Sequence, residues 1–330
     1  MSSNGTIILT RSNVAELLRI DTCIEAVEQA FRLHGQGRTQ APGILGLHAV
    51  DGGFHIKAGI MDLGQSYFVA KANANFPNNR RIGLPTIQGV IIVCDAVNGE
   101  VLALMDSIEI TVIRTGAATA VATKYLAKEN ARSALICGCG SQGRISLEAI
   151  MRVRKLEKVF AYDSDVAEAQ RFSEAMSDKL GIQVGVAGDL AEAARESEIC
   201  VTCTTAREYF LRREYIRPGT FIAAVGADSE DKQELEPRLL SGTKIVADIL
   251  EQSATIGELH HALEDGCVSR SDVYAELGEI VAGTKSGRTN EDEITVFDST
   301  GMALQDVAAA AIVYERALEE GTFETQVVLN

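Results

Sequence analysis

The spacing of apolar residues divides the chain into two parts with different periods. From about residue 130, short apolar runs such as 133–137, 158–163 and 199–205 alternate with amphipathic stretches of helical period, of which 142–154 is the first. This alternation is typical of βαβ units, in which parallel strands form a sheet covered by helices on both faces. We therefore predict a doubly wound α/β domain over residues 126–303.

The first hundred residues follow a different pattern. Apolar runs at about 44–50, 54–60, 67–75, 86–94 and 101–105 have no helical stretches between them, which predicts an antiparallel meander. Two short helices precede it, with Ser12 and Asp21 as their expected N-caps, and a long helix rich in small residues follows Ser107. A strand and a helix return near the C-terminus. We predict an outer α+β domain of residues 1–125 and 304–330.

A glycine pattern marks the first turn of the parallel part. Gly138-x-Gly140-x-x-Gly143 follows an apolar run and opens a helix, and Asp163 ends the next run. Gly138 permits a tight turn, Gly140 permits close approach of a pyrophosphate and Gly143 permits close helix packing, as in a Rossmann dinucleotide-binding fold. The carboxylate at Asp163 suits free ribose hydroxyls, and Ser164 brings no cation for a 2′-phosphate. The pattern favours NAD(H); a purely structural glycine turn is the alternative.

Basic and amide side chains share one face of the expected meander. Period-2 alternation places His55 and Lys57 together on one run, and Lys71 and Asn73 together on another. Paired strands would join these residues into one cationic face, which suits an anion; a solvated face is the alternative. Arg114 lies among small and apolar residues, so burial would require a partner, either a substrate carboxylate or a structural acid.

Composition narrows the class of protein. With 31 Lys and Arg against 46 Asp and Glu, the net charge is −15, which disfavours nucleic acid as a partner. No apolar stretch reaches the roughly 18–20 residues that span a bilayer, so we expect a cytoplasmic protein without a membrane partner. Cys200 and Cys203 lie in a strand-like run and are expected in the core. The five histidines form no ligand motif, so no metal is expected.

These segments occur together, and in this order, in a known family. KANANFPNN, GLPTIQGVIIVCDAVNGEVLALMD, SIEITVIRTGAATAVATKYLA, GCGSQG, GTFIAAVGAD and VFDSTGMALQDVAAA resemble the ornithine cyclodeaminase/mu-crystallin family from about residue 6 to 320. The resemblance implies a homodimer formed through the outer domain, with the Rossmann domain inserted in it and NAD(H) as cofactor. It also implies a small imino or amino acid as the ligand.

The resemblance also implies roles for individual residues. Lys71 matches the catalytic lysine, Arg114 the arginine that binds the substrate carboxylate, and Asp228 the acid that faces the substrate nitrogen. Substrate binding is expected from His55, Lys57, Lys71, Asn73 and Arg114. Cofactor contacts are expected from Thr86, Arg114, Gly138, Gly140, Ser141, Gln142, Gly143, Asp163, Ser164, Thr204, Lys232, Ser299 and Gly301.

Two departures from the family pattern bear on the substrate. Ornithine cyclodeaminases carry an arginine where this chain has Ile44, and an acidic residue where this chain has His55-Ile56-Lys57. The basic residues either hold a second carboxylate or replace the missing arginine. We predict NADH-dependent reduction of a small α-imino acid to the L-amino acid: iminosuccinate to aspartate first, alanine formation or Δ1-pyrroline-2-carboxylate reduction otherwise. The alternatives are an ornithine cyclodeaminase and a non-catalytic mu-crystallin-like binding protein.

Overall fold

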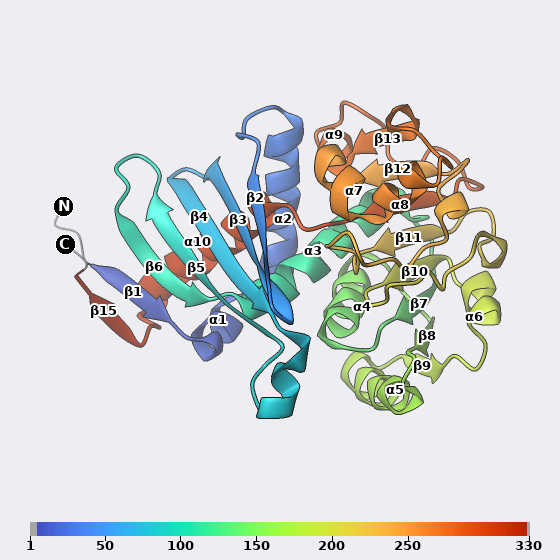
Figure 1. Cartoon of the computed structure of the whole chain (residues 1–330), viewed down its shortest axis with the longest axis horizontal. Helices are drawn as coiled ribbons and strands as arrows, with labels where there is room; N and C mark the ends of the chain where they lie inside the picture. The colour runs from blue at the N-terminus through green and yellow to red at the C-terminus, as the bar shows by residue number, and fades with distance from the viewer. Residues whose placement is uncertain (1–4, 329–330) are drawn as a thin grey trace. The chain divides into compact units, whose positions relative to one another are not determined.

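The chain forms two compact units in the computed structural model, which describes residues 5–328 (Figure 1). Unit 1 contains the residues up to Arg114 and those from Met302 onward, and unit 2 contains Thr115–Gly301. The sequence placed the boundaries at 125/126 and 303/304. Helix α3, Ile108–Leu126, crosses the first boundary, so it begins in unit 1 and continues in unit 2.

The sheet of unit 1 contains the predicted meander. Its strand order is β15-β1-β6-β5-β4-β3-β2, and the run from β2 to β6 is antiparallel throughout. β1 joins parallel to β6, and β15, which was not predicted, joins antiparallel to β1. The strands are β1 Thr6–Leu9, β2 Gly43–Ala49, β3 Gly52–Asp62, β4 Ser66–Asn75, β5 Ile87–Asp95, β6 Val101–Asp106 and β15 Thr325–Val327.

One face of this sheet is covered by helix α10, Ala303–Glu320. A Cβ atom at Gly59 of β3 would lie 3.0 Å from Leu304 Cδ2, so the glycine allows the helix to approach closely. The remaining helices of unit 1 are α1, Arg11–Leu17, and α2, Ile20–Gly35, with a 3₁₀ turn at Pro77–Ile82.

Both helix caps lie two residues before the expected positions. Thr10, rather than Ser12, caps α1 through the backbone N–H of Asn13. Arg19 occupies the N-cap position of α2, and Asp21 lies in the first turn instead. There its charge still favours the helix, because the first turn carries unpaired N–H groups and the positive end of the helix dipole.

The opposite face of the same sheet is apolar and open. Cross-strand register places residues from β2, β3 and β5 on this face, and their exposed fractions run from 36% to 50%. They are Leu45, Leu47, Phe54, Val90 and Ile92. An exposed apolar surface of this kind is typical of an interaction site. We call it the open sheet face.

Unit 2 is the predicted doubly wound domain. Its eight strands are all parallel, in the order β13-β12-β14-β11-β10-β7-β8-β9. The chain first adds β8 and β9 on one side of β7 and then adds β10 on the other, so the strand order reverses between β7 and β10. The strands are β7 Ser133–Cys137, β8 Lys158–Tyr162, β9 Gln183–Val186, β10 Ile199–Thr202, β11 Phe221–Ala224, β12 Lys244–Ala247, β13 Val273–Glu276 and β14 Thr295–Asp298.

Helices connect these strands, as the alternating pattern predicts (Figure 1). They are α4 Ser141–Val153, α5 Val166–Leu180, α6 Leu190–Glu196, α7 Leu250–Ile256, α8 Glu258–Glu264 and α9 Leu277–Val281, with 3₁₀ turns at Arg213–Tyr215, Pro237–Leu239 and Arg270–Asp272. Ligands of such sheets bind beyond the carboxyl ends of the strands, near the switch point. β7 and its glycine turn lie at that point.

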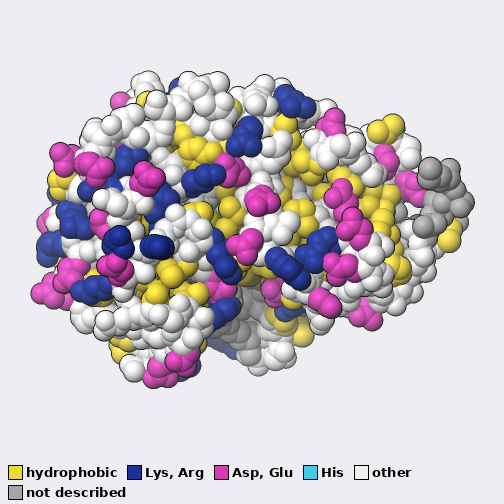
Figure 2. Space-filling model, turned by 180° about the vertical axis from the view of Figure 1, so that it is seen from behind, with side chains coloured by type: hydrophobic (Ala, Val, Ile, Leu, Met, Phe, Trp, Pro, Cys, Tyr) yellow, Lys and Arg dark blue, Asp and Glu magenta, His cyan; other side chains and the backbone are white. Residues whose placement is uncertain are grey.

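The surface carries charges of both signs. On the side shown in Figure 2, lysine and arginine side chains are interspersed with aspartate and glutamate rather than gathered into one basic region. Among the helices that the structure describes, none combines the length and apolar character needed to span a membrane.

Candidate active site

The glycine turn of unit 2 is fixed by contacts within the protein at two of its three glycines. Gly138 has φ of +102°, and a Cβ there would lie 2.8 Å from the carbonyl oxygen of Cys203. A Cβ at Gly143 would clash with the carbonyl oxygen of Gly138. These positions need glycine because the strand β7, the turn and helix α4 pack so closely.

Gly140 differs from the other two. Apart from the adjoining backbone, no described atom lies within 4 Å of the position that its Cβ would take, so internal packing does not demand glycine there. Gly140 is the N-cap of α4 and supplies no side-chain cap. The first N–H groups of α4 are therefore available to an anion, and a side chain at 140 would obstruct it.

Asp163 lies directly beside this turn, at the end of β8. Its Oδ2 accepts a hydrogen bond from the backbone N–H of Cys139 at 2.8 Å, and its Oδ1 accepts one from Asp165 at 3.0 Å. Both oxygens keep further lone pairs, since a carboxylate has about four acceptor sites. The carboxylate is thus oriented by the turn and retains acceptor capacity for two hydroxyl groups.

The other expected cofactor residues of unit 2 lie at the carboxyl ends of the same parallel strands. Ser299 and Gly301 follow β14, where Gly301 N–H donates to Asp248 at 2.7 Å. Thr204 follows β10, and Ala206 N–H donates to its hydroxyl at 3.1 Å. Ser141 and Gln142 open α4, and Ser164 follows Asp163. Thr86 belongs to unit 1.

Asp228 follows β11 and is paired within its own loop. Lys232 Nζ lies 2.5 Å from Asp228 Oδ1 and 3.4 Å from the carbonyl oxygen of Gly226. The Asp228 side chain remains about half exposed, at 47%. The sequence assigned these two residues separate roles and did not foresee that they pair with each other.

Four buried carboxylates hold these loops, and the sequence reasoning missed all of them. Glu234 accepts from Thr204 N–H at 2.5 Å and from Gly226 N–H at 3.2 Å. Glu258 accepts from the backbone N–H groups of Glu234 and Leu235 at 2.8 and 2.9 Å. The other two, Asp248 and Asp298, likewise accept from backbone N–H groups, including those at 301 and 259.

Burial raises the pKa of several of these acids. Desolvation raises the pKa of Asp298 to about 7 and that of Glu258 well above its ordinary value, although backbone donors oppose the shift. The glycines at 226 and 257 are the only feature of the sequence that reflects these buried acids. A Cβ at Gly226 would lie 2.5 Å from the carboxylate of Glu234, and one at Gly257 would lie 2.5 Å from that of Asp298. These acids are structural hydrogen-bond acceptors.

In unit 1, strand pairing assembles the expected basic face. His55 lies opposite Asn73, and Lys57 lies opposite Lys71, in the β3–β4 register. Lys57 and Lys71 are buried, with 8% and 3% exposure, on the side covered by α10. Directly opposed like charges destabilise a sheet, so this face needs anionic partners.

One such partner is Asp306 on α10, which the sequence reasoning did not single out. Lys71 Nζ donates to Asp306 Oδ1 at 2.8 Å, and Arg114 Nε donates to the same oxygen at 3.0 Å. Gln305 Oε1 accepts from Arg114 Nη1 at 3.0 Å. The structural acid that the sequence left open as an alternative partner for Arg114 is therefore present.

The charges of this cluster do not cancel. With all groups ionised, Lys71 and Arg114 carry two positive charges against one on Asp306, and Lys57 adds to the positive potential. Desolvation, reinforced by Arg114 and Lys57, lowers the pKa of Lys71 to about 7, although Asp306 opposes the shift. Burial would raise the pKa of Asp306, but Lys71 and Arg114 hold it below its ordinary value. The arrangement suits an added carboxylate.

Asn73 is oriented by a neighbouring strand end. Ser107 Oγ donates to Asn73 Oδ1 at 2.6 Å, and a Cβ at Gly89 would collide with both groups. The oxygen of the amide is engaged by Ser107, so the amide N–H₂ is the group that Asn73 offers to an anion.

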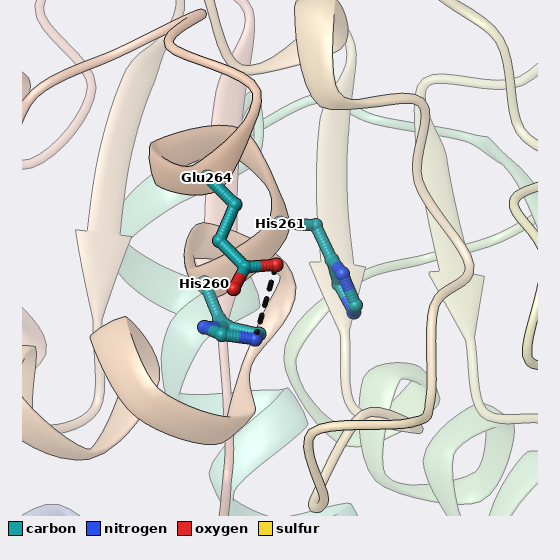
Figure 3. Close-up of side chains that lie close together, drawn as sticks. All are labelled: His260, His261 and Glu264. Atoms are coloured by element: carbon teal, nitrogen blue, oxygen red, sulfur yellow. Dashed lines mark ion pairs between the residues drawn. The ribbon is translucent and has the colours of Figure 1, made fainter.

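A histidine pair on α8 lies close to Glu264 (Figure 3). His260 Nε2 lies 3.5 Å from Glu264, and His261 Nε2 lies 2.8 Å from the carbonyl oxygen of Lys232. The ligand atoms of these three residues all lie within 4.8 Å of one another, which makes them a candidate metal site, but His261 Nε2 is already engaged by the backbone carbonyl of Lys232. We interpret His261 as a tether of the loop that carries Lys232.

The Cys200–Cys203 pair is structural. Cys200 is fully buried on β10, and Cys203 Sγ contacts the carbonyl oxygens of Cys137 and Gly138 at 3.3 and 3.2 Å. Burial raises the pKa of both thiols, which disfavours the reactive thiolate. The predicted core role is confirmed for Cys200, and Cys203 supports the glycine turn.

A parallel sheet whose switch point carries a glycine turn, an open helix N-terminus and an acid after the second strand defines a dinucleotide-binding fold. Comparison with known proteins identifies the family. Residues 4–321 match the model of the ornithine cyclodeaminase/mu-crystallin family, and the chain belongs to this family.

Three solved structures are similar over nearly the whole chain. An archaeal alanine dehydrogenase dimer with bound NAD is 38% identical, with a TM-score of 0.94 and coverage of 98% of this chain and 99% of the other. The Δ1-pyrroline-2-carboxylate reductase of Thermococcus litoralis, in complex with NADH and L-proline, is 35% identical (TM-score 0.89; 97% and 100%). The iminosuccinate reductase of Paracoccus denitrificans, in complex with NAD⁺, is 29% identical (TM-score 0.90; 98% and 100%).

Proposed function

We propose that this protein catalyses the NADH-dependent reduction of a small α-imino acid to the corresponding L-amino acid. The observation that carries the proposal is the buried cluster in which Lys71 and Arg114 share one oxygen of Asp306, with Lys57 opposite Lys71. Two buried cations that share one acid leave positive charge for a substrate carboxylate. The relatives support the class of reaction, since their names include two imine reductases and an amino-acid dehydrogenase.

Anchoring of the carboxylate is the task assigned to unit 1. Nε and one Nη1 hydrogen of Arg114 bind Asp306 and Gln305, and the remaining guanidinium hydrogens suit a carboxylate. Lys71 donates from its ammonium, and Asn73 from its amide. Fixing the acid end of a small substrate orients its imino carbon. This orientation lowers the entropic part of the activation free energy.

NADH would be held by unit 2 and would supply the hydride. Gly138, Gly140 and Gly143 with the N-terminus of α4 suit the pyrophosphate, and Asp163 suits the ribose hydroxyls. Since Asp163 would repel a 2′-phosphate, we expect NADH to be preferred over NADPH. Changing Asp163 to Ala should raise the KM for NADH at least tenfold and leave the KM for the imine nearly unchanged. Equal effects on both KM values would show that Asp163 does not bind the ribose.

Proton handling is assigned to Lys71 and Asp228. A pKa of about 7 lets Lys71 hold or release a proton at Nζ near neutral pH. For Asp228 we retain the role that the family resemblance implies, facing the substrate nitrogen. Its carboxylate is oriented by Lys232, and a negative charge beside the substrate nitrogen would stabilise an iminium.

Cross-strand register refines the choice of substrate. Ile44, which stands where cyclodeaminases have an arginine, lies opposite Lys57 in the β2–β3 pair. Lys57 is therefore placed to replace that arginine on the same carboxylate. This favours a monocarboxylate, as in alanine formation or Δ1-pyrroline-2-carboxylate reduction, over iminosuccinate, the first candidate from sequence. The higher identity to the alanine dehydrogenase, 38% against 29%, points the same way.

The cyclodeaminase alternative finds less support. Its diamino substrate would bring a second ammonium, and the residues that replace the family acid, His55 and Lys57, are basic. A non-catalytic binding protein would have less use for Asp228 beside the cofactor loops.

We further propose that the chain is a homodimer through the open sheet face of unit 1. Five large apolar side chains remain 36–50% exposed there, and one relative is described as a dimer. Light scattering during gel filtration should give about twice the mass of 35.4 kDa. A Leu47→Asp variant should shift it toward the monomer; a monomeric wild type would contradict the assignment.

The function is tested by NADH consumption against a panel. Pyruvate with ammonia or methylamine, oxaloacetate with ammonia, and Δ1-pyrroline-2-carboxylate serve as imine sources, and ornithine with NAD⁺ serves as the cyclodeaminase substrate. We expect turnover with a monocarboxylate imine. Turnover only with oxaloacetate and ammonia would indicate that Lys57 binds the second carboxylate of iminosuccinate. Formation of proline from ornithine without net change in NADH would contradict the proposed reductase function and support a cyclodeaminase.

A further inference from the structure

Asp306 lies in the cationic cluster of Lys57, Lys71 and Arg114. Strand alternation does not predict an acid there, and the proposed roles of the basic residues do not account for it. It lies in the first turn of α10, where the helix dipole favours a negative side chain. The helix packs on β3 and β4, so the carboxylate is directed at the strands that carry Lys57 and Lys71. Its side chain is 1% exposed.

The geometry of its contacts is asymmetric. Oδ1 receives both charged donors, Lys71 Nζ at 2.8 Å and Arg114 Nε at 3.0 Å, whereas Oδ2 is buried without a hydrogen-bond partner among the described residues. The neighbouring amide nitrogen of Gln305 is buried and unpartnered in the same sense. A carboxylate used only to neutralise two cations would gain from engaging both oxygens.

We infer that Asp306 is a positioning residue for the proposed reduction: it aligns the ammonium of Lys71 with the guanidinium of Arg114 and keeps Lys71 cationic for the substrate carboxylate. The inference rests on the proposed function for its kinetic consequence, but not for the alignment itself. Asp306 acts through these two cations and is not assigned any contact with the substrate.

The groups around Lys71 determine the direction of the effect. Arg114 from α3 and Lys57 from β3 oppose its positive charge, Asp306 from α10 favours it, and Cys23 from α2 lies near the same groups as a thiol whose pKa burial raises to about 12. Among these groups Asp306 is the one negative charge near neutral pH. Its removal must therefore favour neutral Lys71.

The decisive variant is Asp306→Asn, which keeps the size of the side chain and removes its charge. If cationic Lys71 binds the carboxylate, kcat/KM of the wild type falls as the pH rises through the pKa of Lys71. We expect this falling limb to move down by at least about one pH unit in the variant, with tenfold or greater loss of kcat/KM at pH 8, mainly through KM. A limb that stays in place would overturn the inference.

The matched control is Glu315→Gln on the same helix. Glu315 accepts a hydrogen bond from Tyr67 at 2.8 Å and lies outside the cationic cluster, so the same chemical change should leave the pH profile in place. A similar shift in this control would mean that any charge change on α10 suffices, and the inference would fail.

A second variant covers the case in which Asp306→Asn does not fold. Asp306→Glu keeps the charge but lengthens the side chain, so we expect the limb to stay in place while kcat/KM falls about tenfold. Wild-type kinetics for Asp306→Glu would contradict a positioning role.

A measurement without substrate separates this inference from the proposed function. The pKa of Lys71 can be followed by NMR of protein labelled with ¹³Cε-lysine, with the signal assigned through Lys71→Met. Asp306→Asn should lower that pKa even if no imine in the panel is reduced. Absence of turnover in the wild type would then reject the function alone, and an unchanged Lys71 pKa would reject the role of Asp306.

Discussion

The two units bury charged side chains in opposite ways. In unit 2, Glu234, Glu258 and Asp298 accept hydrogen bonds from backbone N–H groups of the loops beyond the strands. In unit 1, the charges of Lys71 and Arg114 are both balanced by one oxygen of a single carboxylate. The acids of unit 2 are hydrogen-bonded to backbone N–H groups, which are uncharged and do not titrate. The two cations of unit 1 share one negative charge, so a net positive charge remains. The first arrangement fixes loops, and we propose that the second attracts a ligand.

The difference teaches how to separate structural from functional buried charge. A buried group whose partners are all main-chain atoms gains nothing from a ligand, and its loss leaves buried donors unpaired. A buried cation that shares its counterion gains when a ligand supplies another negative charge. On this basis mutations of the buried acids of unit 2 should affect stability first, and mutations in the cluster of unit 1 should affect kinetics first.

The largest effect is expected for Arg114→Ala. The loss of one carboxylate anchor should lower kcat/KM by about a thousandfold, or roughly 4 kcal/mol of transition-state binding. Arg154 provides the contrast, because within residues 5–328 its buried guanidinium donates only to backbone carbonyl oxygens such as those of Lys128 and Thr123. Arg154→Ala should lower the melting temperature while kcat/KM changes little. Near-wild-type kinetics for Arg114→Ala would make Arg114 structural as well.

A large stability effect is expected for Glu258→Leu in unit 2. Two buried N–H groups, of Glu234 and Leu235, would lose their acceptor, at a cost of about 1–3 kcal/mol each. Urea unfolding should show a decrease in the unfolding free energy of about 2–6 kcal/mol. Glu258→Gln, which keeps one acceptor oxygen, should lose less. If both variants unfold like the wild type, the backbone-matched acids do not fix these loops.

The pH dependence of stability provides a third test. The pKa of Asp298 is raised by burial to about 7 in the folded state, against about 3.9 when unfolded. The folded state therefore binds the proton more tightly, so this group makes the unfolding free energy fall as the pH rises from about 4 to 7. Asp298→Asn should flatten the slope in that window. If the slope is unchanged, other groups cause the dependence of the unfolding free energy on pH in that window.

The smallest expected effect distinguishes two roles for Lys57. If Lys57 replaces the arginine missing at position 44, Lys57→Ala should raise KM about tenfold for monocarboxylate and dicarboxylate imines alike. A loss confined to the dicarboxylate would instead place a second carboxylate on Lys57. Steady-state kinetics with pyruvate and oxaloacetate, each with ammonia, distinguishes these outcomes.

Local patterns predicted most of the fold. Period-2 runs located β2 to β6 within about two residues at each end, and the glycine turn located β7 and α4. Caps were less predictable, because Thr10 and Ser12 are both good N-cap residues and tertiary packing selects between them. Strand β15 was missed, because three residues carry little periodicity.

The candidate site was predicted only in part, for a physical reason. Alternation places Lys57 and Lys71 on one face without any knowledge of tertiary structure, but Asp306 is more than two hundred residues away in sequence. Its position depends on how α10 packs against the sheet. The acids of unit 2 were missed for the same reason, since a buried glutamate and a surface glutamate look alike in sequence.

The insertion of unit 2 has a consequence for the order in which the protein is made. Lys71 and Arg114 precede the whole of unit 2 in the chain, and Asp306 follows it. During synthesis unit 2 can therefore fold as a continuous segment while the two cations still lack their acid. Unit 1 closes only when α10 has been translated, so the proposed anion site can be completed after unit 2 has folded.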